Sequence, residues 1–188
     1  MSFLARWRAD RDAQRKAARY VATLFIEPAL RDIEWLTQNA TRGDVDHATW
    51  ELRYARRALG LIAAQRDALD DRTASIVARE ISEAFARDRG IAAEKTDTAE
   101  RQFNARLSAY RDGLASRAGA PTWTRMGQTL FAFGGGSFKL RDDNIVRAGE
   151  LLFGYLTEAN EALRATFGAV ALPENVAPSE LVGRSAPR

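Results

Sequence analysis

The chain has 188 residues, of which 46% are hydrophobic and 28% charged, with 28 basic and 25 acidic side chains. This composition excludes an intrinsically disordered protein, and the length suffices for one domain with a real hydrophobic core. No cysteine is present, which excludes disulfides, thiolate metal sites and a cysteine nucleophile. Only Lys16, Lys95 and Lys139 are lysines, and this arginine bias, with abundant alanine, indicates a GC-rich bacterial genome.

The first residues do not resemble an export signal. Phe3, Leu4 and Trp7 give way at once to charged residues from Arg8 to Lys16, where a signal peptide would have an uninterrupted apolar stretch. No later apolar run approaches the ~20 residues of a membrane-spanning helix. We therefore expect a cytoplasmic protein.

Helical periodicity begins in residues 2 to about 40. Apolar side chains recur at helical spacing from Ala17 to Leu36, and Pro28 lies inside this stretch. Proline removes a backbone donor and clashes with the preceding turn. The sequence therefore predicts one long helix that is broken or kinked at Pro28 and stops near Gly43.

A second helix is predicted from Asp44 or Asp46, both good N-caps, to about Leu69. A second apolar stripe with Trp50, Tyr54 and Leu61 runs beside the first, which indicates a central helix with neighbours on two sides. The first stripe follows alternating steps of four and three and consists of Ala48, Leu52, Ala55, Leu59, Ile62 and Leu69.

Helix signals continue to Gly168, and no window shows the alternating pattern of a strand. The fold class predicted is therefore all-α, an irregular bundle of about five to six helices. Residues 1–168 form a single domain in this interpretation, and residues 169–188 form a mobile tail. The later helices are predicted to start at Asp71, at Thr96, Asp97 or Thr98, at Thr122, and at Asp142 or Asp143. Asp97 and Glu100 have the spacing of a capping box.

Residues 1–20 are the most unusual segment, since six basic and two acidic side chains give them a net charge of +4. The whole chain carries +3, so the basic character is local. Such a basic amphipathic helix suits an acidic protein, a membrane surface or a nucleic-acid backbone. The alternative is an ordinary first helix that docks on the bundle. The candidate residues are an arginine stripe and the aromatic residues beside it: Phe3, Trp7, Arg8, Arg11, Arg15 and Arg19.

A second candidate is the glycine-rich stretch Gly134–Gly136 with the aromatic residues around it. Glycine-rich backbone can cradle an anion, but the spacing of a P-loop is missing. The alternatives are a hinge whose aromatic residues anchor its ends in the core, or a binding surface. The residues concerned are Trp123, Phe131, Phe133, Phe138, Lys139 and Arg141.

Catalytic and metal-binding patterns are not found in the sequence. His47 is the sole histidine and lies beside capping aspartates, and the Glu-x-x-His pairs of a helical diiron site are missing. We therefore expect no metal and no cofactor, and we lean away from an enzyme. The residues after Gly90 are acidic and would make a poor recognition helix, which argues against nucleic acid.

These observations favour a non-catalytic helical interaction or accessory protein. Its partner is expected to be another protein, bound through the basic first helix or the aromatic glycine-rich loop, with peripheral membrane contact as a further use of the same helix. The alternative is a small-molecule or lipid-binding protein with a pocket between helices near residues 123–138. The sequence does not fix the oligomeric state.

Overall fold

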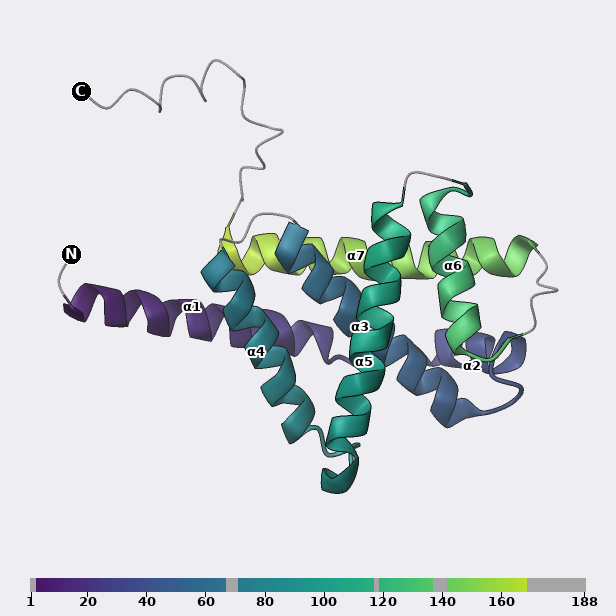
Figure 1. Cartoon of the computed structure of the whole chain (residues 1–188), viewed down its shortest axis with the longest axis horizontal. Helices are drawn as coiled ribbons and strands as arrows, with labels where there is room; N and C mark the ends of the chain where they lie inside the picture. Colours follow the sequence, from purple (N-terminus) through teal and green to yellow (C-terminus); the bar gives the residue numbers. More distant parts are fainter. Residues whose placement is uncertain (1–2, 67–70, 117–118, 137–141, 169–188) are drawn as a thin grey trace, which may run out of the picture.

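The computed structural model describes residues 3–66, 71–116, 119–136 and 142–168. These ranges contain seven α-helices, one short 3₁₀ turn and no strand, so the all-α prediction is confirmed (Figure 1). The expected tail, residues 169–188, lies outside them. The elements are α1 (Phe3–Leu24), α2 (Leu30–Asn39), α3 (Val45–Arg66), α4 (Asp71–Arg87), η1 (Ala93–Lys95), α5 (Thr96–Ala115), α6 (Thr122–Phe133) and α7 (Asp142–Phe167).

Of the two alternatives predicted at Pro28, the structure has the break and the kink is wrong, and the count of five to six helices is wrong too. The chain leaves helical geometry after Leu24, and α2 begins separately at Leu30. A residue that precedes proline is pushed out of the helical region, which accounts for an end before Pro28. Ala29 then has extended backbone, with φ −63° and ψ 137°, and starts the new helix. Pro28 is therefore part of a linker between two helices.

The N-terminal caps agree with the sequence at some helices and differ at others. The Asp44 carboxylate accepts a hydrogen bond from the backbone N–H of His47 at 2.9 Å, as expected of an N-cap. The predicted capping box of Asp97 and Glu100 is wrong. The turn η1 runs directly into α5, and Glu100 accepts a hydrogen bond from Ser82 of α4 instead.

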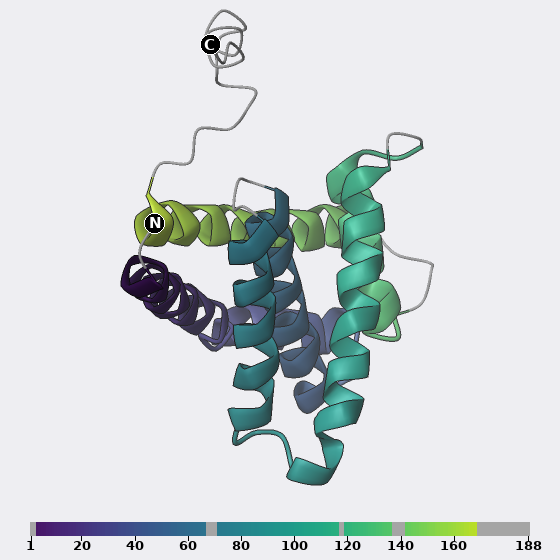
Figure 2. The same cartoon turned by 60° about the vertical axis from the view of Figure 1, so that its left-hand side comes forward.

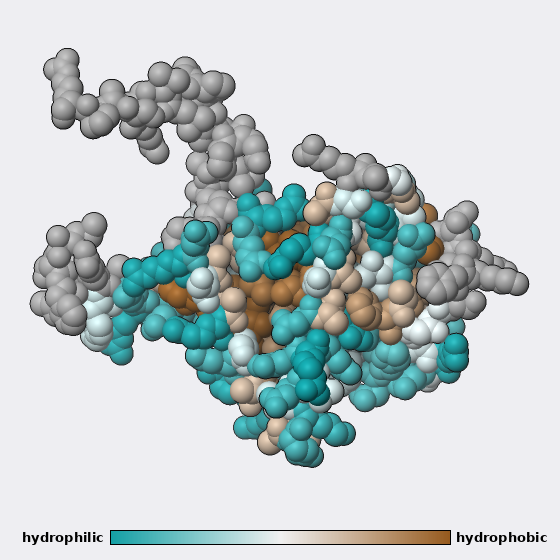
Figure 3. All heavy atoms as spheres, in the orientation of Figure 1, coloured by the Kyte–Doolittle hydropathy of each residue, from teal (hydrophilic) through white to brown (hydrophobic). Residues whose placement is uncertain are grey.

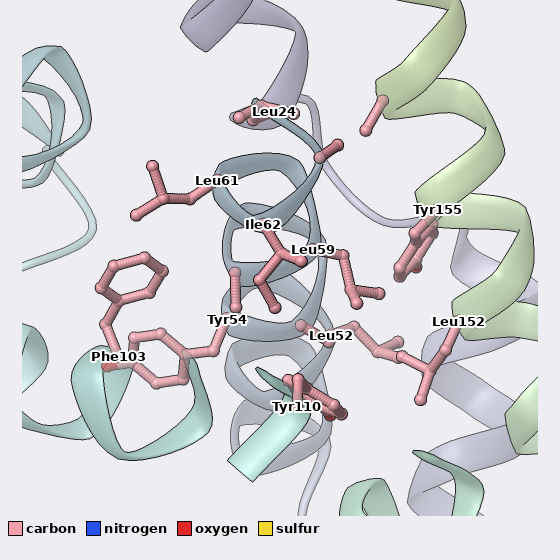
Figure 4. Close-up of a cluster of buried hydrophobic side chains, with 14 of the residues drawn as sticks. Leu24, Leu52, Tyr54, Leu59, Leu61, Ile62, Phe103, Tyr110, Leu152 and Tyr155 are labelled. Carbon is pink, nitrogen blue, oxygen red and sulfur yellow. The ribbon is translucent and has the colours of Figure 1, made fainter. Parts of the chain in front are cut away.

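Helix α3 is the centre of the fold, as its two apolar stripes predicted. Its first stripe is fully buried from Ala48 to Ile62, while Leu69 lies outside the described residues. Leu52 and Leu59 point toward α7, and Tyr54 and Leu61 point toward α5 (Figure 4). The other helices surround α3, with α4 and α5 beside each other (Figure 2). Apolar residues at the centre of one face lie in a hollow between α4 and α5 (Figure 3).

Helices α6 and α7 make the most extensive contact among the described elements, and two glycines let their backbones come close. A Cβ atom on Gly149 would lie 2.6 Å from the carbonyl oxygen of Trp123, and one on Gly127 would lie 2.4 Å from that of Ile145. Real Cβ atoms do not come so close to backbone atoms. Gly154 of α7 has open space where its Cβ would be. The distance between the two helices is therefore set by glycine at positions 127 and 149.

We predict opposite effects for two alanine substitutions in α7. Gly149→Ala should lower the free energy of unfolding by about 1–3 kcal/mol, because the added methyl group must push α6 and α7 apart. Gly154→Ala serves as the matched control and should raise it by roughly 0.5–1 kcal/mol, through helix propensity alone. Urea denaturation of both variants tests this, and a loss of stability in Gly154→Ala would contradict the packing described here.

Three tyrosines, Tyr20, Tyr110 and Tyr155, have their hydroxyl groups buried in the core. Tyr20 donates a hydrogen bond to the carbonyl oxygen of Gly60 at 2.8 Å. Within the described part of the chain, the hydroxyls of Tyr110 and Tyr155 have no hydrogen-bond partner. Burial raises the pKa of both groups well above the ordinary value of 10.0. The folded protein therefore strongly favours neutral tyrosine.

This burial predicts loss of stability at high pH. In the unfolded chain Tyr110 ionises near pH 10.0, but in the folded chain only at higher pH. The stability that this difference provides is complete below the unfolded pKa and falls as the pH rises above it. During alkaline titration, tyrosinate absorbance and loss of helical circular dichroism should appear together. Tyr110→Phe should unfold at higher pH than the wild type, and tyrosinate formation well before helix loss would contradict the prediction.

Candidate functional site

The outward side of α1 carries the arginine stripe singled out in the sequence. Four residues of the opposite side, Ala17, Tyr20, Val21 and Leu24, are at most 3% exposed and pack into the core. Since successive helical residues are rotated by about 100°, the stripe faces directly away from the bundle. All four of its side chains are exposed, and we call Arg8, Arg11, Arg15 and Arg19 the arginine face.

The aromatic residues beside this face do not cover it. Trp7 is 49% exposed, and the Arg11 guanidinium lies 4.6 Å from the centre of its ring. A cation over an aromatic face is favourable and keeps both groups at the surface. Trp7 thus does not dock into the core, as an ordinary first helix would require. Phe3 begins α1, but its side chain lies outside the described residues.

Two aspartates adjust the charge of α1. Asp12 pairs with Lys16 at 3.0 Å and with Arg15 at 3.3 Å. The hydrogen bond and charge of Lys16, aided by Arg15, hold the pKa of the Asp12 carboxyl below its ordinary value. Asp10 instead pairs with Arg72 of α4 and so fastens the N-terminal half of α1 to the bundle.

Of the residues predicted around the glycine-rich loop, the three that the structure describes have different surroundings. Phe131 is fully buried and meets Trp35 edge to face at 5.8 Å, so it belongs to the core. Phe133 is half-buried beneath the Arg106 guanidinium, 4.3 Å from the ring centre. Trp123 is 41% exposed at the other end of α6. The remaining candidates, Phe138, Lys139 and Arg141, lie outside the described residues.

Glu51 is a buried charge at the centre of a second cluster. It is 1% exposed and accepts hydrogen bonds from both Nε and Nη2 of Arg106. His47 Nε2 lies 3.3 Å from Glu51 and 3.1 Å from the carbonyl oxygen of Phe133. These contacts join α3, α5 and the end of α6. They occupy the Glu51 carboxylate, so it is not available as a general base.

Arg57 is a second buried charge on α3, and its burial is not predicted above. Arg57 is 2% exposed, and its Nη2 donates a hydrogen bond to Asp88 Oδ2 at 2.9 Å. The guanidinium lies 3.8 Å from the ring centre of Phe25 and 4.8 Å from that of Phe85. Burial lowers the pKa of Arg57, and Asp88 opposes that change. One signal was present, since Arg57 follows Tyr54 by three residues on the second apolar stripe of α3.

Breaking this buried pair should destabilise the fold. Asp88→Ala leaves the Arg57 guanidinium buried without its counterion, and we expect a loss of about 3–5 kcal/mol in the free energy of unfolding. Asp112→Ala removes an exposed aspartate and should change it by less than about 0.5 kcal/mol. Chemical denaturation distinguishes the two variants. Equal stabilities would mean that water already solvates Arg57.

Other kinds of site gain no support from the ranges that the structure describes. They contain no group of three or more histidine and carboxylate side chains placed to hold a metal ion. None of their helices combines the length and apolar character needed to cross a membrane. Comparison with known proteins gives no match among family models, curated proteins or solved structures.

Proposed function

We propose that this is a non-catalytic accessory protein that binds an acidic surface of another protein through the arginine face of α1. The observation that supports this most directly is the exposure of four guanidinium groups on one side of a helix whose other side is core. Arginine and tryptophan are enriched among the residues that dominate binding at protein interfaces. Guanidinium groups also pair with carboxylates through two parallel hydrogen bonds.

An acidic protein suits this helix better than a membrane does. A helix that lies in a bilayer inserts its apolar side between the lipids. In α1 that side is already occupied, because Ala17, Tyr20, Val21 and Leu24 are buried against the other helices. Among its described residues, the exposed side carries one large apolar side chain, Trp7, and otherwise arginines, Gln14 and small alanines.

Nucleic acid is also a less suitable partner. Long polyanions bind with high affinity when many basic groups contact successive phosphates. Residues 1–20 carry a net charge of +4 and the whole chain carries +3, so the remaining residues sum to −1. A compact acidic patch matches this localised charge, and it would also speed association through electrostatic steering.

The alternative of a small-molecule pocket near residues 123–138 has less support. From Met126 to Phe131 the inward side of α6 is filled by core residues, and among the described residues of this range Arg125 lines a cavity, at the N-terminal end of the helix. Binding through the aromatic loop would rest on Trp123 and on residues outside the described ranges. The arginine face is therefore the better candidate.

Charge reversal of the arginine face tests the proposal. A photo-crosslinking amino acid at Ala18, an exposed position next to the face, should capture the partner in the native host. Replacing Arg8, Arg11 and Arg15 by glutamate should abolish this capture and leave the melting temperature nearly unchanged, because none of the three is buried. Capture should also weaken as salt exceeds ~0.15 M, where the screening length is about 8 Å.

The matched control reverses three exposed arginines elsewhere, Arg31, Arg89 and Arg101. It changes the net charge equally and should keep capture intact. If both triple variants lose capture, the effect is one of total charge and the arginine face is not the binding site. If the α1 variant loses stability but keeps its partner, the helix serves the fold alone.

A further inference from the structure

A cavity of about 850 Å³ lies where the C-terminal ends of α3 and α5 meet the N-terminal end of α6. These three helix ends lie on the same side of the molecule (Figure 1). Ile62 and Arg66 line the cavity from α3, Arg111 and Leu114 from α5, and Arg125 from α6. Its volume is within the range of small-molecule sites, roughly 300–1,000 Å³. The site is separate from the arginine face of α1.

Among the described residues, the charged side chains that line the cavity are all basic. Three of its lining residues are arginines, and no carboxylate side chain is among the described residues that line it. By contrast, Arg53, Arg57 and Arg106 each pair with a carboxylate elsewhere in the described chain. A wall with basic groups alone attracts anions.

Arg125 neutralises the partial negative charge at the C-terminal end of α5, next to the cavity. Its Nε donates to the carbonyl oxygen of Gly113 at 3.1 Å, and its other nitrogens donate to the carbonyl oxygens of Ser116 and Ala120. Free carbonyls at the C-terminal end of α5 would repel an anion through their partial negative charge. Because Arg125 is engaged with them, its role is to shape and neutralise the site.

Arg66 and Arg111 are the groups available to a ligand. Both side chains are exposed at helix ends, and Arg111 uses Nη2 to hold Gln65 at 2.7 Å. The wall also has apolar side chains, buried Ile62 and half-buried Leu114.

We propose that this cavity binds a small anionic amphiphile, a molecule with a short apolar chain and a carboxylate or phosphate head. Its head contacts Arg66 and Arg111, and its chain lies on Ile62 and Leu114. An anion without an apolar part would contact only the two arginines, and an uncharged chain would contact only the two apolar side chains. The two halves of the site thus select one class of ligand.

Titration calorimetry with the full chain tests this, with decanoate and decyl phosphate as probes and decanol as the uncharged reference. The wild type should bind the two anions more tightly than decanol. Combined Arg66→Glu and Arg111→Glu should weaken anion binding at least about tenfold, because charge-assisted hydrogen bonds are lost. Decanol binding should stay unchanged. The tighter of the two anions identifies the head group.

The control variant combines Arg89→Glu and Arg101→Glu, exposed positions that do not line the cavity. It should bind decanoate as the wild type does, and so should the triple reversal in α1. Failure of the wild type to bind either anion below its micelle-forming concentration would overturn the proposal. Equal weakening in the control would overturn it too, by reducing the effect to net charge. Neither outcome depends on whether α1 binds a partner protein.

Discussion

The enclosure of α3 is the constraint on which the rest of the structure depends. A helix that is apolar around most of its circumference must be covered on every side, and a 22-residue helix needs several neighbours for this. Helices α2, α4, α5 and α7 all pack against it. The short helices and sharp linkers elsewhere in the chain bring these neighbours into place. The result is an irregular bundle rather than a regular four-helix arrangement.

Enclosure also dictates how the charges of α3 are satisfied. Glu51 and Arg57 lie on buried sides of this helix, so each needs a counterion from a neighbour. Arg106 of α5 serves Glu51, and Asp88, just after α4, serves Arg57. A buried ion pair adds little net stability, but a wrongly placed neighbour would leave a charge unpaired. The two pairs therefore specify which helices lie on which side of α3.

Much of this architecture could be predicted from the sequence, because apolar periodicity and caps act locally. The two stripes of α3, the cap at Asp44 and the helical class all follow from such signals. The buried position of Arg57 could not be predicted, since a charged residue is normally read as a surface residue and its cover comes from distant segments. The same holds for the glycines of α6 and α7, whose close contact depends on two helices at once.

The candidate sites divide in the same way. The exposure of the arginine face follows from the helical spacing of its residues and of Ala17 to Leu24 behind it. The cavity at the ends of α3, α5 and α6 could not be foreseen, because its arginines are far apart in the sequence and only tertiary packing unites them. The aromatic residues near the glycine-rich loop were grouped by sequence proximity, yet the fold sends Phe131 into the core and leaves Trp123 at the surface.

The anchoring of α1 has a kinetic consequence. Its C-terminal half is core, and Asp10 near its other end pairs with Arg72 of α4, so the arginine face is already helical in the chain alone. Docking there requires no folding step, and the ordering entropy that slows or weakens the binding of disordered basic tails is largely absent. Association with such a surface is governed by the rate of diffusional encounter, and complex lifetime by the contacts made afterwards. Under the proposed function, such a preformed basic helix suits a partner that is met quickly and released again.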